Sequence, residues 1–61
     1  MADKSEVYFE ITIIGGSAKV AAVDAATGIE VVAIGPASAS RAELQRLALG
    51  KLKARLAREP D

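Results

Sequence analysis

Three short segments of the chain, 7–14, 18–23 and 29–34, alternate their side chains in the period-two pattern of β-strands. The first segment is the richest in β-branched and aromatic residues, which favour strands. In each segment apolar residues occupy both alternating faces rather than one face alone. The pattern therefore predicts three strands that carry apolar side chains on both sides of a sheet.

Short connections are expected to join these strands into hairpins. Gly15-Gly16 stands between the first two segments, and glycine readily adopts the positive φ angles of a two-residue hairpin turn. The connection from Asp24 to Gly28 begins with a side chain that can bond nearby amides and ends with a glycine suited to the left-handed region. Gly35-Pro36 is expected to end the third strand, because proline has no N–H to donate to a neighbouring strand. The result is an antiparallel meander.

A single helix is predicted from about residue 41 to residue 58. Ser40 and Glu43 match the capping box, in which each side chain satisfies a backbone amide at the helix start. Apolar residues then recur at three- and four-residue spacings, as on one face of a helix. This stripe consists of Leu44, Leu47, Ala48, Leu52 and Leu56, and Leu49 widens it. We interpret Gly50, inside the helix, as tolerated rather than as a close approach to another backbone.

The order strand, strand, strand, helix predicts a small α+β domain with the helix across one face of the meander. One helix cannot cover two apolar sheet faces, so one face remains as an association surface. The pattern leaves open which face this is. It consists either of the opposite side chains or of Tyr8, Ile14, Val23, Val32 and Ile34. The most economical cover is a second copy of the chain, and we place Leu49 of the helix in the same predicted homodimer interface.

Two arrangements of this homodimer remain open. The sheets either stack or join edge to edge with each helix on its own sheet, or the subunits exchange helices or strands. A hinge at residues 35–39 would allow exchange, giving an intertwined, domain-swapped dimer. From the sequence, Val32→Asp or Ile34→Asp is expected to disrupt association or folding.

The length of the chain also favours association. Its 61 residues suffice for one domain over residues 1–61, a size at which burial barely offsets the entropy of ordering. Thirteen of the apolar residues are alanines, so the core is small. Natural small domains gain stability from disulfides, a metal or a partner chain, and the absence of Cys and His removes the first and nearly all of the second. Oligomerisation is therefore the remaining source of added stability.

Basic and acidic residues cancel overall but are segregated along the chain. Residues 1–36 contain two basic and five acidic residues, 2 − 5 = −3, and residues 37–61 contain six and three, 6 − 3 = +3. A basic helix held against an acidic sheet is one interpretation. The alternative is polyanion contact through helix residues Arg46, Lys51, Lys53, Arg55 and Arg58. These residues are spread around much of the helix and have no aromatic stacking platform beside them.

No catalytic, metal-binding or cofactor-binding constellation is recognisable. Ser38 and Ser40 have no histidine to serve as a general base. Glu10 and Glu30 fall on the outer strands of the meander and are not expected to meet as an acid and base. The chain start lacks a signal-peptide pattern, and no apolar run is long enough to span a membrane. We therefore expect a cytoplasmic, non-enzymatic protein that uses no cofactor.

Several segments together resemble a family of very short, uncharacterised alphaproteobacterial proteins. They are the Val7-Tyr8-Phe9-Glu10-Ile11 strand, the stretch from Val20 to Gly28, and Gly35-Pro36-Ala37-Ser38-Ala39 before a leucine-rich helix. The resemblance covers nearly the whole chain and implies a bacterial cytoplasmic origin without any functional residue. The meander and helix are also similar to the second half of the double-stranded RNA-binding domain, although this chain lacks that domain's first helix and the basic start of its last helix.

From these observations we expect a structural or protein-interaction module that acts as a homodimer and offers a surface to another macromolecule. The alternative is a nucleic-acid-binding accessory protein that uses the basic helix.

Overall fold

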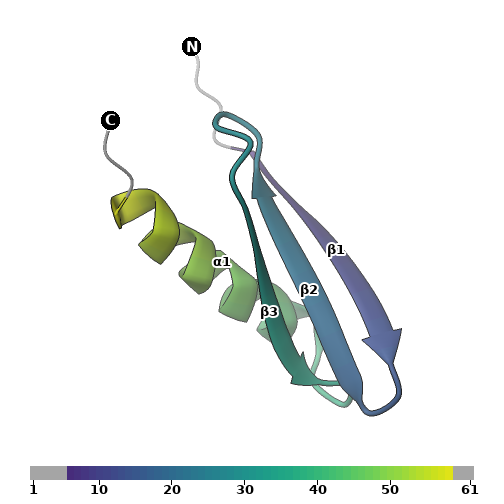
Figure 1. Ribbon diagram of the computed structural model, residues 1–61. Coiled ribbons are helices and arrows are strands. Elements are labelled where there is room, and N and C mark those ends of the chain that lie inside the picture. Colours follow the sequence, from purple (N-terminus) through teal and green to yellow (C-terminus); the bar gives the residue numbers. More distant parts are fainter. Residues whose placement is uncertain (1–5, 59–61) are drawn as a thin grey trace.

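The computed structural model describes residues 6–58 and contains one sheet and one helix (Figure 1). Strands β1 (Val7–Ile14), β2 (Ser17–Asp24) and β3 (Glu30–Pro36) are followed by helix α1 (Arg41–Arg58). The sheet order is β1-β2-β3, and both strand pairs are antiparallel. The predicted α+β fold, a three-stranded meander followed by one helix, is confirmed.

The first hairpin has a two-residue turn. Ile14 lies opposite Ser17, which leaves Gly15 and Gly16 as the central residues. Gly15 has a φ of 59°, whereas Gly16 is not in the positive-φ region. This combination is typical of a type II′ turn, whose twist matches that of the flanking strands.

Asp24 organises the second hairpin. Its buried carboxylate accepts hydrogen bonds from the backbone N–H of Thr27 at 2.9 Å and from the Thr27 hydroxyl at 2.7 Å. Gly28, with a φ of 78°, donates its N–H to the Asp24 carbonyl at 2.7 Å. The only buried acidic side chain among residues 6–58 is therefore occupied in holding a turn.

Strand β3 ends at Pro36, so Gly35-Pro36 close the strand as expected, but they lie within it and extend it two residues past the predicted end at 34. Asp24 donates its N–H to the carbonyl of Ile29. Residues of an antiparallel strand bond alternately toward and away from their neighbour, so the odd-numbered residues that follow Ile29 bond to β2. The even-numbered residues, Pro36 among them, face away from β2. The missing N–H of Pro36 removes no bond from the sheet. The pairing continues beyond it, where Ala37 donates its N–H to the Gly16 carbonyl at 2.9 Å.

The start of α1 has the predicted capping box. The Ser40 N–H donates to Glu43 Oε1 and the Glu43 N–H donates to Ser40 Oγ, each at 3.1 Å. Leu44, Ala48 and Leu52 of the predicted stripe are buried. Leu47 differs from the expectation, because 49% of its surface is exposed.

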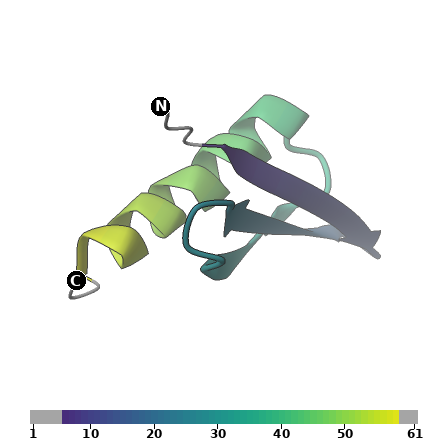
Figure 2. The same ribbon diagram turned by 90° about the horizontal axis from the view of Figure 1, so that it is seen from above.

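Helix α1 lies on one side of the sheet (Figure 2). It packs mainly on β2 and β3. The buried core consists of Ala18, Val20, Ala22, Val31, Ala33, Leu44, Ala48 and Leu52. All five strand residues in this core are alanine or valine, and these small side chains let the helix lie close to β2 and β3. Strand β1 lies to one side of the helix, and its Val7, Phe9 and Ile11 are only partly buried.

Candidate functional site

The helix-free face of the sheet carries the main exposed apolar surface of the described residues. The register places five of the predicted interface residues on this face: Tyr8, Ile14, Val23, Val32 and Ile34. Tyr8 is 59% exposed, Ile14 63% and Ile34 61%. The sixth predicted interface residue, Leu49, belongs to α1 and therefore lies on the other side of the sheet.

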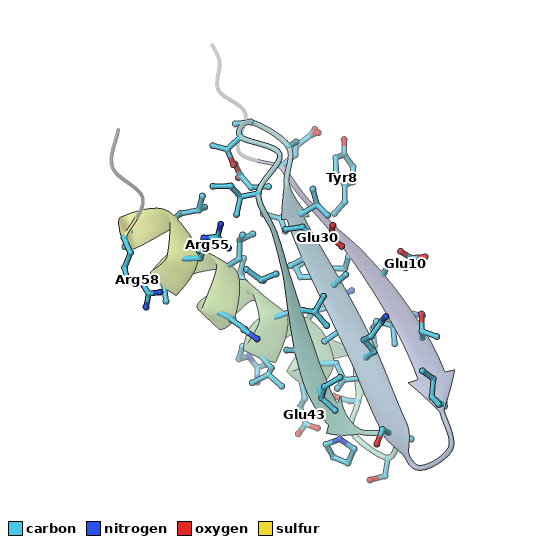
Figure 3. All side chains as sticks on the ribbon, viewed as in Figure 1. Tyr8, Glu10, Glu30, Glu43, Arg55 and Arg58 are labelled. Carbon is cyan, nitrogen blue, oxygen red and sulfur yellow. The ribbon has the colours of Figure 1, made fainter. Side chains whose placement is uncertain are left out.

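Charged side chains share the helix-free face with these apolar ones. Glu10 lies on β1 and Glu30 on β3, and Figure 3 shows both on the sheet and apart from each other. Lys19 lies on β2 opposite Thr12 of β1. Since β2 separates the two carboxylates, the face has alternating charges and apolar groups and does not bring Glu10 and Glu30 together as an acid and a base.

An apolar groove opens on the opposite side, between β1 and the helix. It has a volume of about 370 Å³ and is lined by Val7, Phe9, Asp24, Leu49, Leu52, Lys53 and Leu56. The groove exists because α1 is displaced toward β3, which leaves the helix-facing side of β1 incompletely covered. The sequence pattern gave no sign of it, because the lateral position of a helix on a sheet is set by packing and not by periodicity.

Four of the five predicted polyanion-binding residues fall on two sides of α1, and the fifth, Arg46, is an exposed residue of the same helix. Lys51, Arg55 and Arg58 line a hollow of about 270 Å³ beside Val31 of β3. Lys53 lies at the groove beside β1. Figure 3 shows Arg55 and Arg58 on the last turns of α1. The helix therefore presents two separate basic groups rather than one continuous basic face.

Tyr8 makes a defined polar contact on the helix-free side. Its hydroxyl donates a hydrogen bond to Glu6 Oε1 at 2.8 Å. This bond, then the negative charge of Glu6 and a small effect of burial raise the pKa of Tyr8 above its ordinary value. The contact fixes the orientation of the one exposed aromatic ring on this face.

This contact predicts an abnormal titration of Tyr8. The chain has one tyrosine and no tryptophan, so phenolate absorbance follows this group alone. We expect a midpoint above about 10 in the unaltered protein and a lower one in Glu6→Ala, which lacks both the acceptor and the charge. Glu10→Ala, a change of another exposed carboxylate on β1, is the control and should leave the midpoint close to that of the unaltered protein. Equal midpoints for Glu6→Ala and the unaltered protein would contradict the contact.

Comparison with known proteins gives one match. The model of a domain family, described as a domain of unknown function (DUF6898), matches residues 4–59. No curated protein and no solved structure matches the chain. Within the described residues, no helix is long and apolar enough to cross a membrane.

Proposed function

The chain belongs to the DUF6898 family, which its description leaves without an assigned role, and we propose that it is a non-enzymatic module that acts as a homodimer and binds another macromolecule. The observation that carries this proposal is the exposure of large apolar side chains on the helix-free face. Tyr8, Ile14 and Ile34 each expose more than half of their surface there. Exposed apolar groups gathered on one face are typical of interaction surfaces.

The state of the ionisable groups supports a non-enzymatic role. Asp24, the buried carboxylate, is occupied by Thr27 in a turn, and Glu10 and Glu30 lie on different edges of the sheet. The chain has neither histidine nor cysteine. The cytoplasmic location and alphaproteobacterial origin expected from the sequence belong to this same proposal.

The dimer is supported by the small core. The largest fully buried side chains are Leu52 and Val20, and most of the remaining core is alanine. A core of this kind gives little stability by itself, and association with a second copy adds apolar burial. Side-by-side subunits need no rearrangement. Exchange of subunits requires the connection between β3 and α1 to open. This connection is tight, because Ala39 donates its N–H to the Pro36 carbonyl at 3.0 Å.

Nucleic-acid binding has less support than protein interaction. Lys51 already donates a hydrogen bond to the Val32 carbonyl, and Lys53 lies on the other side of the helix from Arg58. A polyanion backbone is bound most strongly by cations that share one face.

The dimer is tested by light scattering after size exclusion and by thermal unfolding, each at concentrations from about 1 to 100 µM. We expect the mass of two chains at the upper end and a midpoint of unfolding that rises with concentration, because dissociation accompanies unfolding. A mass of one chain throughout, with a midpoint that is independent of concentration, would refute the dimer.

A further inference from the structure

The outer edge of β1 has backbone groups that no described residue satisfies. Ala25 donates its N–H to the Glu6 carbonyl at 3.0 Å, which fixes the even-numbered residues of β1 as those that bond to β2. The odd-numbered residues therefore direct their N–H and C=O groups outward: Val7, Phe9, Ile11 and Ile13. Strand β1 is an edge strand, and it contains neither proline nor lysine, the residues that commonly prevent an edge from pairing with a strand of another chain.

The opposite edge of the sheet is protected. On β3 the even-numbered residues face outward, and the carbonyl of one of them, Val32, accepts a hydrogen bond from Lys51 Nζ. Pro36, at the end of the same edge, has no N–H to offer. A lysine laid across an edge and a proline within it are two of the devices that prevent strand addition. The two edges of the sheet therefore differ, and β1 is the one left open for pairing.

The side chains of β1 on the helix side also lack a complete cover. Val7, Phe9 and Ile11 are only partly buried, and Ile13 is 56% exposed. The apolar groove beside Phe9 continues this uncovered surface toward α1. An open edge with apolar flanks fits a second strand of similar character, and β1 itself has that character.

Charge and backbone alternation select the register of such a pair. We compare three registers for antiparallel pairing of β1 with β1 of a second copy. Each places one residue, Phe9, Glu10 or Ile11, opposite the same residue of the partner subunit. With Glu10 opposite Glu10, two carboxylates face each other directly, which is destabilising. With Phe9 opposite Phe9, the exposed Ile13 extends past the described start of the partner strand and gains no cover there. With Ile11 opposite Ile11, Ile13 lies beside Phe9 of the partner subunit.

We propose that two copies of the chain join antiparallel through the outer edges of β1, with Ile11 opposite Ile11 of the partner subunit. This inference rests on the proposed dimer and names its contact. The outward N–H and C=O groups of Phe9, Ile11 and Ile13 then bond to the partner strand, since in this register they form the hydrogen-bonded pairs. The product is one continuous six-stranded sheet with both helices on the same side.

The same register accounts for the exposed residues of β1 on the helix-free side. Tyr8 lies opposite Ile14 of the partner subunit, and aromatic with β-branched is a favourable cross-strand pair. Glu10 lies opposite Thr12 of the partner subunit, which can donate a hydrogen bond to the carboxylate. The two helix-free faces then form one continuous surface, which leaves Val32 and Ile34 of each copy free for the macromolecular partner.

A pair of lysine substitutions distinguishes this edge contact from stacking of the sheets. Ile13→Lys places a charge beside the β1 edge, and Ile34→Lys places one on the helix-free face. Both residues are more than half exposed, so neither change should unfold a single subunit. We expect Ile13→Lys to raise the dimer dissociation constant by at least about tenfold and Ile34→Lys to leave it nearly unchanged. Edge pairing thereby differs from the expectation from the sequence, in which a charge at residue 34 disrupts association. Light scattering measures the dimer, and circular dichroism verifies the fold.

The register is read by cysteine trapping, which is unambiguous in a chain without native cysteine. Glu10→Cys and Thr12→Cys are prepared separately, mixed as equal parts, allowed to exchange subunits and oxidised mildly. In the proposed register each cysteine faces the other type across a non-hydrogen-bonded pair, where the Cα atoms lie about 4.5 Å apart. We expect the mixed disulfide to predominate, and intact mass identifies it because the two variants differ in mass.

The outcomes separate this inference from the proposed function. Loss of the dimer in Ile34→Lys but not in Ile13→Lys would overturn edge pairing and leave the dimeric module standing. Predominant Glu10→Cys homodisulfide would overturn the register. A single-chain mass for the unaltered protein at all concentrations would remove the dimer and the edge contact together.

Discussion

Leu52→Ala is expected to lower the free energy of unfolding by about 3 kcal/mol, within the range found for buried leucines. Leu52 is fully buried in the core and is, with Val20, its largest completely enclosed side chain. It also lines the groove beside β1, so its loss enlarges a space that is already incompletely filled. A domain of 61 residues has a total stability of roughly 3 to 9 kcal/mol, so this change removes a large part of it.

Urea or thermal unfolding followed by circular dichroism measures this effect. All variants are compared at one protein concentration, because association contributes to the apparent stability. Leu47→Ala is the matched control, since Leu47 belongs to the same helix and is 49% exposed. It should cost less than about 1 kcal/mol. Equal losses for the two leucines would show that the helix does not bury the face described here.

The elements were predictable because their local signals agree. The two-residue Gly15-Gly16 turn and the capping box of Ser40 and Glu43 each mark a boundary by a specific backbone requirement. The third strand includes Gly35 and Pro36, beyond the predicted end at 34, because the effect of a proline on a strand depends on the direction its nitrogen faces. That direction follows from the register and is not visible in a list of strand-forming residues.

The face covered by the helix could have been deduced from charge. A two-residue turn after Ile14 fixes Glu10 and Lys19 on one side of the sheet, and the second hairpin places Glu30 on that side too. The other side carries no charged strand residue except Asp24, which is used in its turn. Apolar content alone left the covered face open, because the core is built from small side chains. The helix-facing core residues of β2 and β3 are small, which allows close packing of the helix, and larger branched residues of these strands lie on the open face.

The exposed helix-side surface of β1 and the groove beside it could not be predicted, because both depend on where the helix lies on the sheet. A stripe of leucines specifies which face of a helix is buried, but not whether it rests over two strands or three. Here α1 rests on β2 and β3, which exposes Ile13 and opens the groove at Leu49. Leu49 was expected in the same interface as Val32, and the fold instead assigns them to opposite sides of the sheet.

The close approach of the helix to β3 depends on Gly35. A Cβ atom built on Gly35 would lie 2.8 Å from Cδ2 of Leu44 and 3.8 Å from Cδ2 of Leu47. The φ angle of Gly35 is outside the positive region, so the requirement here is for space and not for a special backbone conformation. Leu44 is 3% exposed and is enclosed by the core, which limits how far its side chain can move.

Gly35→Val is therefore expected to destabilise the domain by about 2 to 3 kcal/mol through overpacking, measured by the same unfolding experiment. Gly50→Ala is the contrasting variant. Gly50 is exposed in the helix interior, and apart from its chain neighbours and the nearby backbone of its own helix nothing lies within 4 Å of a Cβ built there, so alanine should stabilise by about 1 kcal/mol. Leu44→Ala combined with Gly35→Val should cost less than the sum of the separate changes, because removing the leucine methyl groups relieves the collision. Strictly additive losses would mean that the valine acts elsewhere than at the contact between β3 and α1.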